Sequence, residues 1–149
     1  MAEFEPVGGN DRARELFAAM LDARSSVPSG ARETAARWDS RADEWERCGG
    51  ALQTEHGKRA QDASEFLIGR GALGAQSEVA DIGCGPGRFV CEFAGTARSV
   101  TGFDISRRMT ELGAQRAREL GLENVSFRAC DFHALDVEAE GLAGKFDLV

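Results

Sequence analysis

Apolar residues in the first half of the chain recur at intervals of three and four positions, which predicts helices. The stripe over residues 10–24 is that of a helix that buries one face. After a loop rich in Pro, Gly and Ser at residues 25–30, a second helix is expected from about Glu33 to Arg47, ended by Gly49–Gly50. A third is expected from about Leu52 to Arg70. The first half is therefore predicted to be helical.

From about residue 78 the pattern changes to short apolar strands that alternate with helices. Strands are expected over residues 78–82, 99–103 and 125–129, and helices over residues 86–97 and 107–120. Ser106 is a suitable N-cap for the second of these helices, and Gly121 a suitable stop. This alternation is typical of a parallel sheet with crossover helices.

The last residues, Phe146–Val149, look like the opening of a fourth strand. The chain is therefore expected to stop before such a fold is complete, as a truncated or partial form of a longer protein. A central strand left at the edge of a sheet exposes unpaired backbone groups. A homodimer formed through this exposed fourth strand is accordingly expected.

Charge and composition narrow the class of partner. The formal net charge of −7 and pI of about 4.9 disfavour binding to nucleic acid and to anionic membranes, so a small-molecule partner is expected. No apolar run is long enough to span a membrane, and the N-terminus is acidic where a signal peptide would be basic. These features predict a cytoplasmic protein.

The cysteines do not form a metal-binding pattern. Cys48, Cys84, Cys91 and Cys130 include no C-x-x-C pair, and the chain has only two histidines. Their scatter among apolar neighbours fits reduced thiols packed as small hydrophobes. No metal is expected.

A glycine-rich turn follows the first predicted strand, from Asp81 to Arg88. Such a turn lets the backbone approach a ligand closely and aims the amides of the next helix at it. The dinucleotide fingerprint G-x-G-x-x-G would need a third glycine at position 88, which is arginine. The pattern present is D-x-G-x-G-x-G, which disfavours a nicotinamide or flavin enzyme.

These residues resemble the class I, Rossmann-like, S-adenosylmethionine-dependent methyltransferases. The match covers about half of the chain in four ordered pieces: Val79–Gly87, Asp104, Asp131–Phe132 and Phe146–Val149. In an open parallel sheet, residues at the C-terminal ends of successive strands converge on one ligand site. The resemblance implies S-adenosylmethionine as the cofactor.

The resemblance also implies a role for each residue. The glycine loop would wrap the methionine portion of the cofactor, with Asp81 supporting the loop. Asp104 would accept hydrogen bonds from both ribose hydroxyls, and Asp131 would accept one from the adenine amino group, with Phe132 flanking the base. The implied cofactor-binding residues are Asp81, Gly83, Cys84, Gly85, Gly87, Asp104, Ile105, Asp131 and Phe132. The catalytic residues are not assigned.

The segment Trp38–Trp45 resembles an N-terminal W-D-x-R-A-x-x-W stretch that lies near the site as a lid in some small methyltransferases. The other interpretation is that both tryptophans simply anchor a helix to the core. Arg88 either reaches the cofactor carboxylate or faces solvent. His133 is interpreted as a loop residue without a catalytic role.

The predicted fold is α/β: an open, mostly parallel Rossmann-like sheet of order 3-2-1-4, truncated, with helices on both faces and a helical N-terminal segment. Residues 1–74 are interpreted as a helical segment or lid and residues 75–149 as the cofactor-binding domain. The predicted function is methyl transfer from S-adenosylmethionine to a small-molecule acceptor. The alternative is a non-catalytic module that binds S-adenosylmethionine or S-adenosylhomocysteine, or one half of an assembly.

Overall fold

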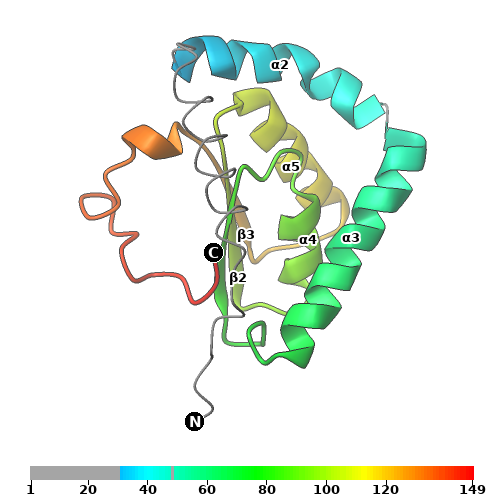
Figure 1. Ribbon diagram of the computed structural model, residues 1–149, viewed down its shortest axis with the longest axis vertical. Helices are drawn as coiled ribbons and strands as arrows, with labels where there is room; N and C mark the ends of the chain where they lie inside the picture. The colour runs from blue at the N-terminus through cyan, green and yellow to red at the C-terminus, as the bar shows by residue number, and fades with distance from the viewer. Residues whose placement is uncertain (1–30, 48) are drawn as a thin grey trace, which may run out of the picture. The chain divides into compact units, whose positions relative to one another are not determined.

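The computed structural model describes residues 31–47 and 49–149. Two helices come first, α2 (Ala31–Arg47) and α3 (Gly49–Gly69). Strands and helices then alternate: β1 (Glu78–Ile82), α4 (Arg88–Ala94), β2 (Ser99–Asp104), α5 (Arg107–Glu119), β3 (Val125–Ala129) and a short 3₁₀ helix, η1 (Phe132–Ala134). Figure 1 shows α3 running beside α4, with α2 crossing the end of α5. The predicted change from helices to alternating elements is confirmed.

The strands form one parallel sheet in the order β1-β2-β3. Ile82 pairs with Phe103, and Gly102 pairs with Phe127. The predicted fourth strand is reduced to a single parallel bridge between Val79 and Leu148, on the side of β1 away from β2. The bridge places this segment where the order 3-2-1-4 requires it.

Helices α4 and α5 cover the same face of the sheet. Gly102 faces Val90 of α4, and its register partner Phe127 faces Gly113 of α5. Because register partners point to the same side of a sheet, both helices pack on one side. Valines and phenylalanines fill this layer, and Val79, Val90 and Val100 are almost completely buried there.

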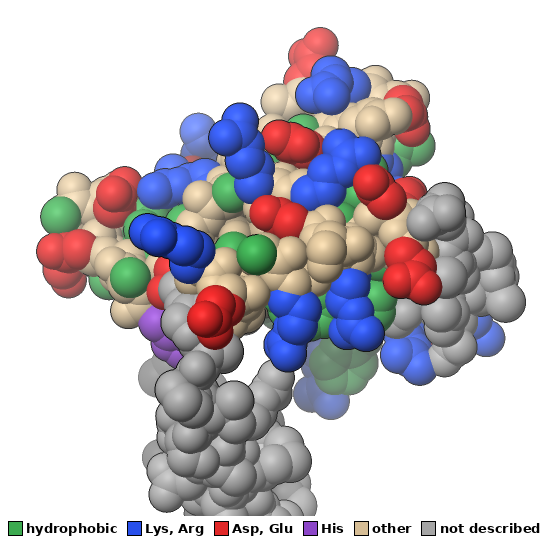
Figure 2. All heavy atoms as spheres, turned by 90° about the horizontal axis from the view of Figure 1, so that it is seen from above, with side chains coloured by type: hydrophobic (Ala, Val, Ile, Leu, Met, Phe, Trp, Pro, Cys, Tyr) green, Lys and Arg blue, Asp and Glu red, His purple; other side chains and the backbone are tan. Residues whose placement is uncertain are grey.

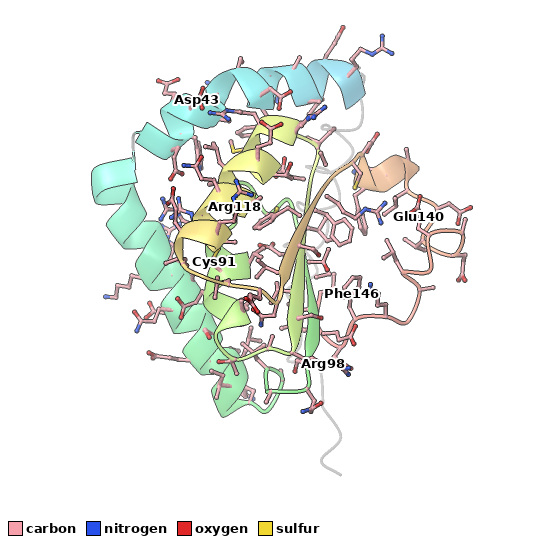
Figure 3. The ribbon with its side chains drawn as sticks, turned by 180° about the vertical axis from the view of Figure 1, so that it is seen from behind. Asp43, Cys91, Arg98, Arg118, Glu140 and Phe146 are labelled. Atoms are coloured by element: carbon pink, nitrogen blue, oxygen red, sulfur yellow. The ribbon has the colours of Figure 1, made fainter. Side chains whose placement is uncertain are left out.

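In the described part of the chain, the opposite face of the sheet is covered by residues that follow β3. Phe103 is 1% exposed, and its ring makes edge contacts with Phe132 and Phe146, at centroid distances of 5.7 and 6.1 Å. Phe132 belongs to η1, and Phe146 belongs to the irregular segment that follows it. Cys91 of α4 and Phe146 lie on opposite sides of the strands in Figure 3. Helices were expected on both faces; of the described elements, α4 and α5 pack on one face, and the short 3₁₀ helix η1 contributes Phe132 to the other.

Helix α2 is attached mainly through polar side chains. Within residues 32–46, Ala42 is the one residue that is buried, while Trp38 and Trp45 pack edge to face with each other and Trp45 is 46% exposed. Acidic and basic side chains are intermingled over the surface seen in Figure 2. Trp38 is thus half-buried and Trp45 more exposed, and the lid and anchor interpretations of this segment both stay predictions.

Several predicted helix boundaries need correction. Gly49–Gly50 was predicted to end a helix, but these residues begin α3. Helix α4 starts two residues later than predicted because Gly87 has a left-handed backbone, with φ of 72°, and acts as the N-cap; it also ends earlier, at Ala94, with Gly95 as its C-cap. Helix α5 has the predicted caps: the Ser106 hydroxyl accepts a hydrogen bond from the N–H of Met109, and Gly121 has φ of 68°. The predicted helix at residues 10–24, the loop at residues 25–30 and Cys48 lie outside the described residues.

Candidate functional site

The glycine loop between β1 and α4 alternates in backbone handedness. Gly83, Gly85 and Gly87 have φ of 78°, 51° and 72°, values that L side chains rarely adopt. A Cβ at Gly83 or Gly85 would meet nothing within 4 Å, so these two residues border open space. The loop can therefore present bare backbone to a ligand.

Backbone hydrogen bonds attach this loop to the end of β2. The N–H groups of Gly83 and Cys84 both donate to the carbonyl of Phe103, at 2.7 and 3.0 Å. The N–H of Gly85 donates to Oδ2 of Asp104 at 2.8 Å. Three N–H groups of the loop thus donate to acceptors at the end of β2, and the role of Asp81 in supporting the loop stays a prediction.

Asp104 occupies the centre of the candidate site. Its Oδ1 accepts a hydrogen bond from the N–H of Ser106 at 2.8 Å, while its Oδ2 accepts that of Gly85. A carboxylate can accept about four hydrogen bonds, so two backbone donors fix its orientation and leave capacity for further donors. The carboxylate is thus held at the C-terminal end of β2, next to the loop.

Asp81 lies beside Asp104 at the end of β1. Burial raises the pKa of the Asp81 carboxyl, and the negative charge of Asp104 raises it further. Two acids at neighbouring strand ends repel each other, which makes this edge of the sheet favourable for a cationic or hydrogen-donating group.

Cys84 points away from the open side of the loop. Its side chain is 8% exposed and packs against Gly102 in the middle of β2. Burial, followed by the charges of Asp81 and Asp104, raises the pKa of its thiol. The side chain is therefore a neutral packing group.

Gly102 of β2 and Gly113 of α5 were not singled out from the sequence, yet both are needed to form the site. A Cβ at Gly113 of α5 would stand 2.5 Å from the ring of Phe127, and one at Gly87 would stand 2.6 Å from the same ring. Gly102 is similarly enclosed by Cys84 and Val90. A glycine inside a strand or a helix is a signal of close approach, and Gly102 and Gly113 carried that signal.

The residues after β3 form the other end of the candidate site. Asp131 caps η1, its Oδ1 accepting a hydrogen bond from the N–H of His133 at 3.1 Å. Phe132 is 37% exposed and rests edge-on against Phe103. Ile105 is half-buried between β2 and α5. Asp104 and Asp131 thus follow neighbouring strands at the same edge of the sheet.

Arg88 belongs to an ionic cluster on the helical side of the loop. Glu46 of α2 forms an ion pair with Arg116 of α5 and lies 4.0 Å from Arg88. Arg116 also donates to the carbonyl of Pro86 at 3.2 Å. Burial, followed by the charge of Arg116, lowers the pKa of Arg88. Of the two interpretations of Arg88, the one in which it faces solvent does not hold, since its side chain is 16% exposed.

The described residues carry neither a metal-binding cluster nor a membrane-spanning helix. Residues 31–47 and 49–149 contain no group of three or more His, Cys, Asp or Glu side chains suited to a metal ion. None of the described helices combines the length and apolar character that a membrane span requires.

Comparison with known proteins places the fold. Magnesium protoporphyrin IX methyltransferase of Synechocystis PCC 6803, solved with bound SAH, aligns with a TM-score of 0.61 at 24% identity, over 70% of this chain and 53% of that one. The structure of the same enzyme with bound SAM gives 0.62 at 23%, over 74% and 58%. Such similarity supports the Rossmann-like methyltransferase fold.

A curated relative is similar over a shorter stretch. The 23S rRNA (uracil(1939)-C(5))-methyltransferase RlmD of Alcanivorax borkumensis is 38% identical over 65 residues, 44% of this chain and 14% of that protein. The chain thus spans a small part of this relative and little more than half of the solved enzyme. A family model described as a methyltransferase domain matches residues 73–149. Because this match covers more than half of the 149 residues, the chain belongs to the methyltransferase domain family.

Proposed function

We propose that this chain binds S-adenosylmethionine and forms the cofactor-binding part of an S-adenosylmethionine-dependent methyltransferase. The observation that carries the proposal is the position of Asp104, hydrogen-bonded to Gly85 of the left-handed glycine loop and to Ser106. Family membership and the bound SAM and SAH of the two solved neighbours support it.

The described residues fit this cofactor. Asp104 would accept the ribose hydroxyls with its remaining acceptor capacity, a charge-assisted arrangement stronger than neutral hydrogen bonds. Gly83 and Gly85 would receive the methionine portion, because a Cβ there would project into open space. Gly87 shapes the loop, and Cys84 would contribute through its backbone only.

The adenine end of the cofactor would lie along the residues that follow β3. Asp131 would accept from the adenine amino group, and Phe132 and Ile105 would flank the base. Bound S-adenosylmethionine supplies a methyl group on a positively charged sulfur. The task of this chain is to hold that group in line with an acceptor and to exclude water.

The acceptor that we propose is a small molecule. The net charge of −7 opposes binding to an RNA or DNA backbone, although RlmD, a relative over part of the chain, is an rRNA enzyme by name. We assign residues 75–149 to cofactor binding and residues 1–74 to a helical segment or lid. The free thiols of Cys84, Cys91 and Cys130 favour a cytoplasmic location.

We also propose that two copies associate beside β1. Leu148 accepts from the N–H of Ala80 at 2.9 Å, and a groove of about 370 Å³ next to it is lined largely by apolar residues, including Leu67 and Phe89. Val149 at its rim is 78% exposed.

A substitution at this rim tests the proposed association. Val149→Lys should lower the fraction of dimer in light scattering, whereas Val137→Lys, at an exposed position in the segment after β3, should not. A monomeric wild type would contradict this proposal.

Ligand titration tests the cofactor assignment. S-adenosylhomocysteine at a hundred times its dissociation constant should stabilise the fold by about 2.7 kcal/mol, and NAD should not. Loss of a charged hydrogen-bond acceptor costs about 1.5 to 3 kcal/mol, so Asp104→Asn should weaken binding while Asp62→Asn, on the exposed surface of α3, should not. Equal affinity in the two variants would contradict the ribose assignment.

Turnover separates the two functional hypotheses. An enzyme should transfer a methyl group from S-adenosylmethionine to a small-molecule acceptor. A non-catalytic module should bind S-adenosylhomocysteine with the same dependence on Asp104 and transfer no methyl group.

A further inference from the structure

Ser106 connects two acidic residues that belong to different elements. Its backbone N–H donates to Oδ1 of Asp104 at 2.8 Å, while its hydroxyl donates to Oδ1 of Asp39 on α2 at 2.6 Å. Ser106 is completely buried, while the two acceptors, Asp39 and Asp104, are each partly exposed. A continuous path of hydrogen bonds therefore runs from α2 to Asp104.

Asp39 also caps α5 from outside that helix. Oδ1 of Asp39 accepts from the N–H of Arg108 at 3.0 Å, and the Ser106 hydroxyl accepts from the N–H of Met109. Two N–H groups of the first turn are thus satisfied, one by the helix's own N-cap and one by α2. An acid at a helix N-terminus is also favoured by the helix dipole.

The position of Ser106 depends on both partners. Without Asp39, the buried hydroxyl of Ser106 and the N–H of Arg108 would each lose an acceptor, and the first turn of α5 would relax to find others. The backbone N–H that orients Asp104 belongs to the same residue. A change at Asp39 is therefore transmitted to Asp104 without direct contact between the two acids.

From this geometry we propose that Asp39 is a positioning residue for ribose recognition: through Ser106 it holds Asp104 in the orientation that accepts the ribose hydroxyls. This inference rests on the proposed function of Asp104. It also couples the docking of α2 to the occupancy of the site, since a ligand held by Asp104 stabilises the same hydrogen bonds that hold α2.

The alternative role for Asp39 is a helix cap that only stabilises the fold. A cap of this kind would lower the melting temperature without changing how the site discriminates between ligands. A positioning residue changes the preference for ligands that carry both ribose hydroxyls. The ratio of two affinities measured on the same variant separates these roles, because loss of folded protein cancels in the ratio.

The experiment compares S-adenosylhomocysteine with its 2′-deoxy analogue by isothermal titration calorimetry. Wild type should bind the complete ligand about tenfold more tightly, the loss expected for one hydrogen bond to a charged acceptor. Asp39→Ala should weaken binding of the complete ligand about tenfold and bring the ratio close to one. Asp39→Asn keeps a side-chain oxygen for Ser106 and Arg108 and should restore most of the wild-type ratio.

Asp43→Ala is the matched control. Asp43 lies one turn further along α2 and binds the guanidinium of Arg108 at 2.7 and 2.9 Å, so its loss weakens the same helix contact without touching Ser106. In Asp43→Ala, the ratio of the affinities for the two ligands should equal that of wild type. If Asp39→Ala does not fold, Ser106→Ala breaks the same path and should give the same fall in the ratio.

Each outcome bears on a single hypothesis. A wild-type ratio in Asp39→Ala, or in Ser106→Ala where the former is unfolded, would overturn the positioning role while leaving the cofactor assignment intact. An equal fall in Asp43→Ala would overturn it too, because docking of α2 in general would then be responsible. Failure of wild type to bind S-adenosylhomocysteine would instead refute the proposed function.

Discussion

The thiol of Cys84 lies directly against the backbone of Gly102, so that a Cβ at position 102 would stand 2.8 Å from the sulfur and 2.9 Å from Val90. Gly102→Ala is therefore expected to destabilise the protein by about 1 to 3 kcal/mol through overpacking. Adding Cys84→Ala should recover part of this loss. Chemical denaturation of the single and double variants measures both effects.

Gly57→Ala is the control for this experiment. Its Cβ would meet nothing within 4 Å in α3, and alanine favours a helix over glycine by about 0.5 to 1 kcal/mol. Its stability should rise. A Gly102→Ala variant as stable as wild type would show that β2 and α4 separate more easily than the packing indicates.

Gly87 and Gly113 both pack against the ring of Phe127. A smaller side chain at position 127 should restore stability to an alanine variant of one of them but not of the other. Phe127→Leu makes room for a Cβ at either position, so it should restore much of the stability that Gly113→Ala loses. Gly87→Ala should not be rescued, because the left-handed backbone at φ of 72° opposes any side chain. A double-mutant cycle of melting temperatures distinguishes the two. Equal rescue would show that the loop can change its backbone conformation.

The raised pKa of Asp81 makes stability depend on pH. The folded protein holds a proton that the unfolded chain releases, so stability falls as the pH rises from the ordinary value of 3.8 through the raised pKa. Asp81→Asn removes this charge. The variant should be more stable than wild type at pH 7, and the difference should shrink as the pH is lowered towards 3.8.

Asp39→Asn should have the opposite effect on stability at pH 7. Hydrogen bonds from Ser106 and then from Arg108 lower the pKa of Asp39, so its contribution is present above the ordinary value and is lost as the pH falls through the lowered pKa. The variant should lose stability at pH 7 and match wild type in strong acid. Urea denaturation at several pH values tests both acids; two parallel curves would contradict the assignment.

Asn124 lies directly before β3 and supports the C-terminal end of α4. Its amide donates to the carbonyls of Ala94 and Ala97, at 2.9 and 3.0 Å. Asn124→Ala should cost about 1 to 3 kcal/mol, because these part-buried carbonyls lose their partner. Gln115→Ala removes an exposed hydrogen bond to Glu119 on the surface of α5 and should cost much less. A thermal melt that ranks the two variants the other way would contradict this role.

Local sequence patterns predicted the strands better than the helices. The predicted bounds of β1 and β3 agree with the structure, because short apolar runs between turn residues describe buried strands well. The predicted helix over residues 86–97 was too long at its start, since Gly87 is a left-handed N-cap that packs against the ring of Phe127 in β3. That contact joins residues 40 positions apart and is invisible in a local pattern.

The candidate site was predictable only in part. Strand order brought Asp104 close to the glycine loop, as the spacing suggested. The hydrogen bond from Gly85 to Asp104 was not predictable, because it joins residues 19 positions apart on different elements. The link from Asp39 to Ser106 spans 67 residues and has no signature in the sequence.

The hydrogen bonds that hold α2 join residues far apart in the sequence. This separation also sets an order of events in folding. Gly85 and Asp104 are 19 residues apart, whereas the side-chain hydrogen bonds from α2 to α5 close loops of 65 to 70 residues. Longer loops cost more entropy to close and form later. The strands and the glycine loop should therefore assemble first during synthesis, and α2 should dock last. The glycine loop and Asp104 would then be folded for a time before α2 has docked. During that time they would form an early folding unit that is still open to solvent.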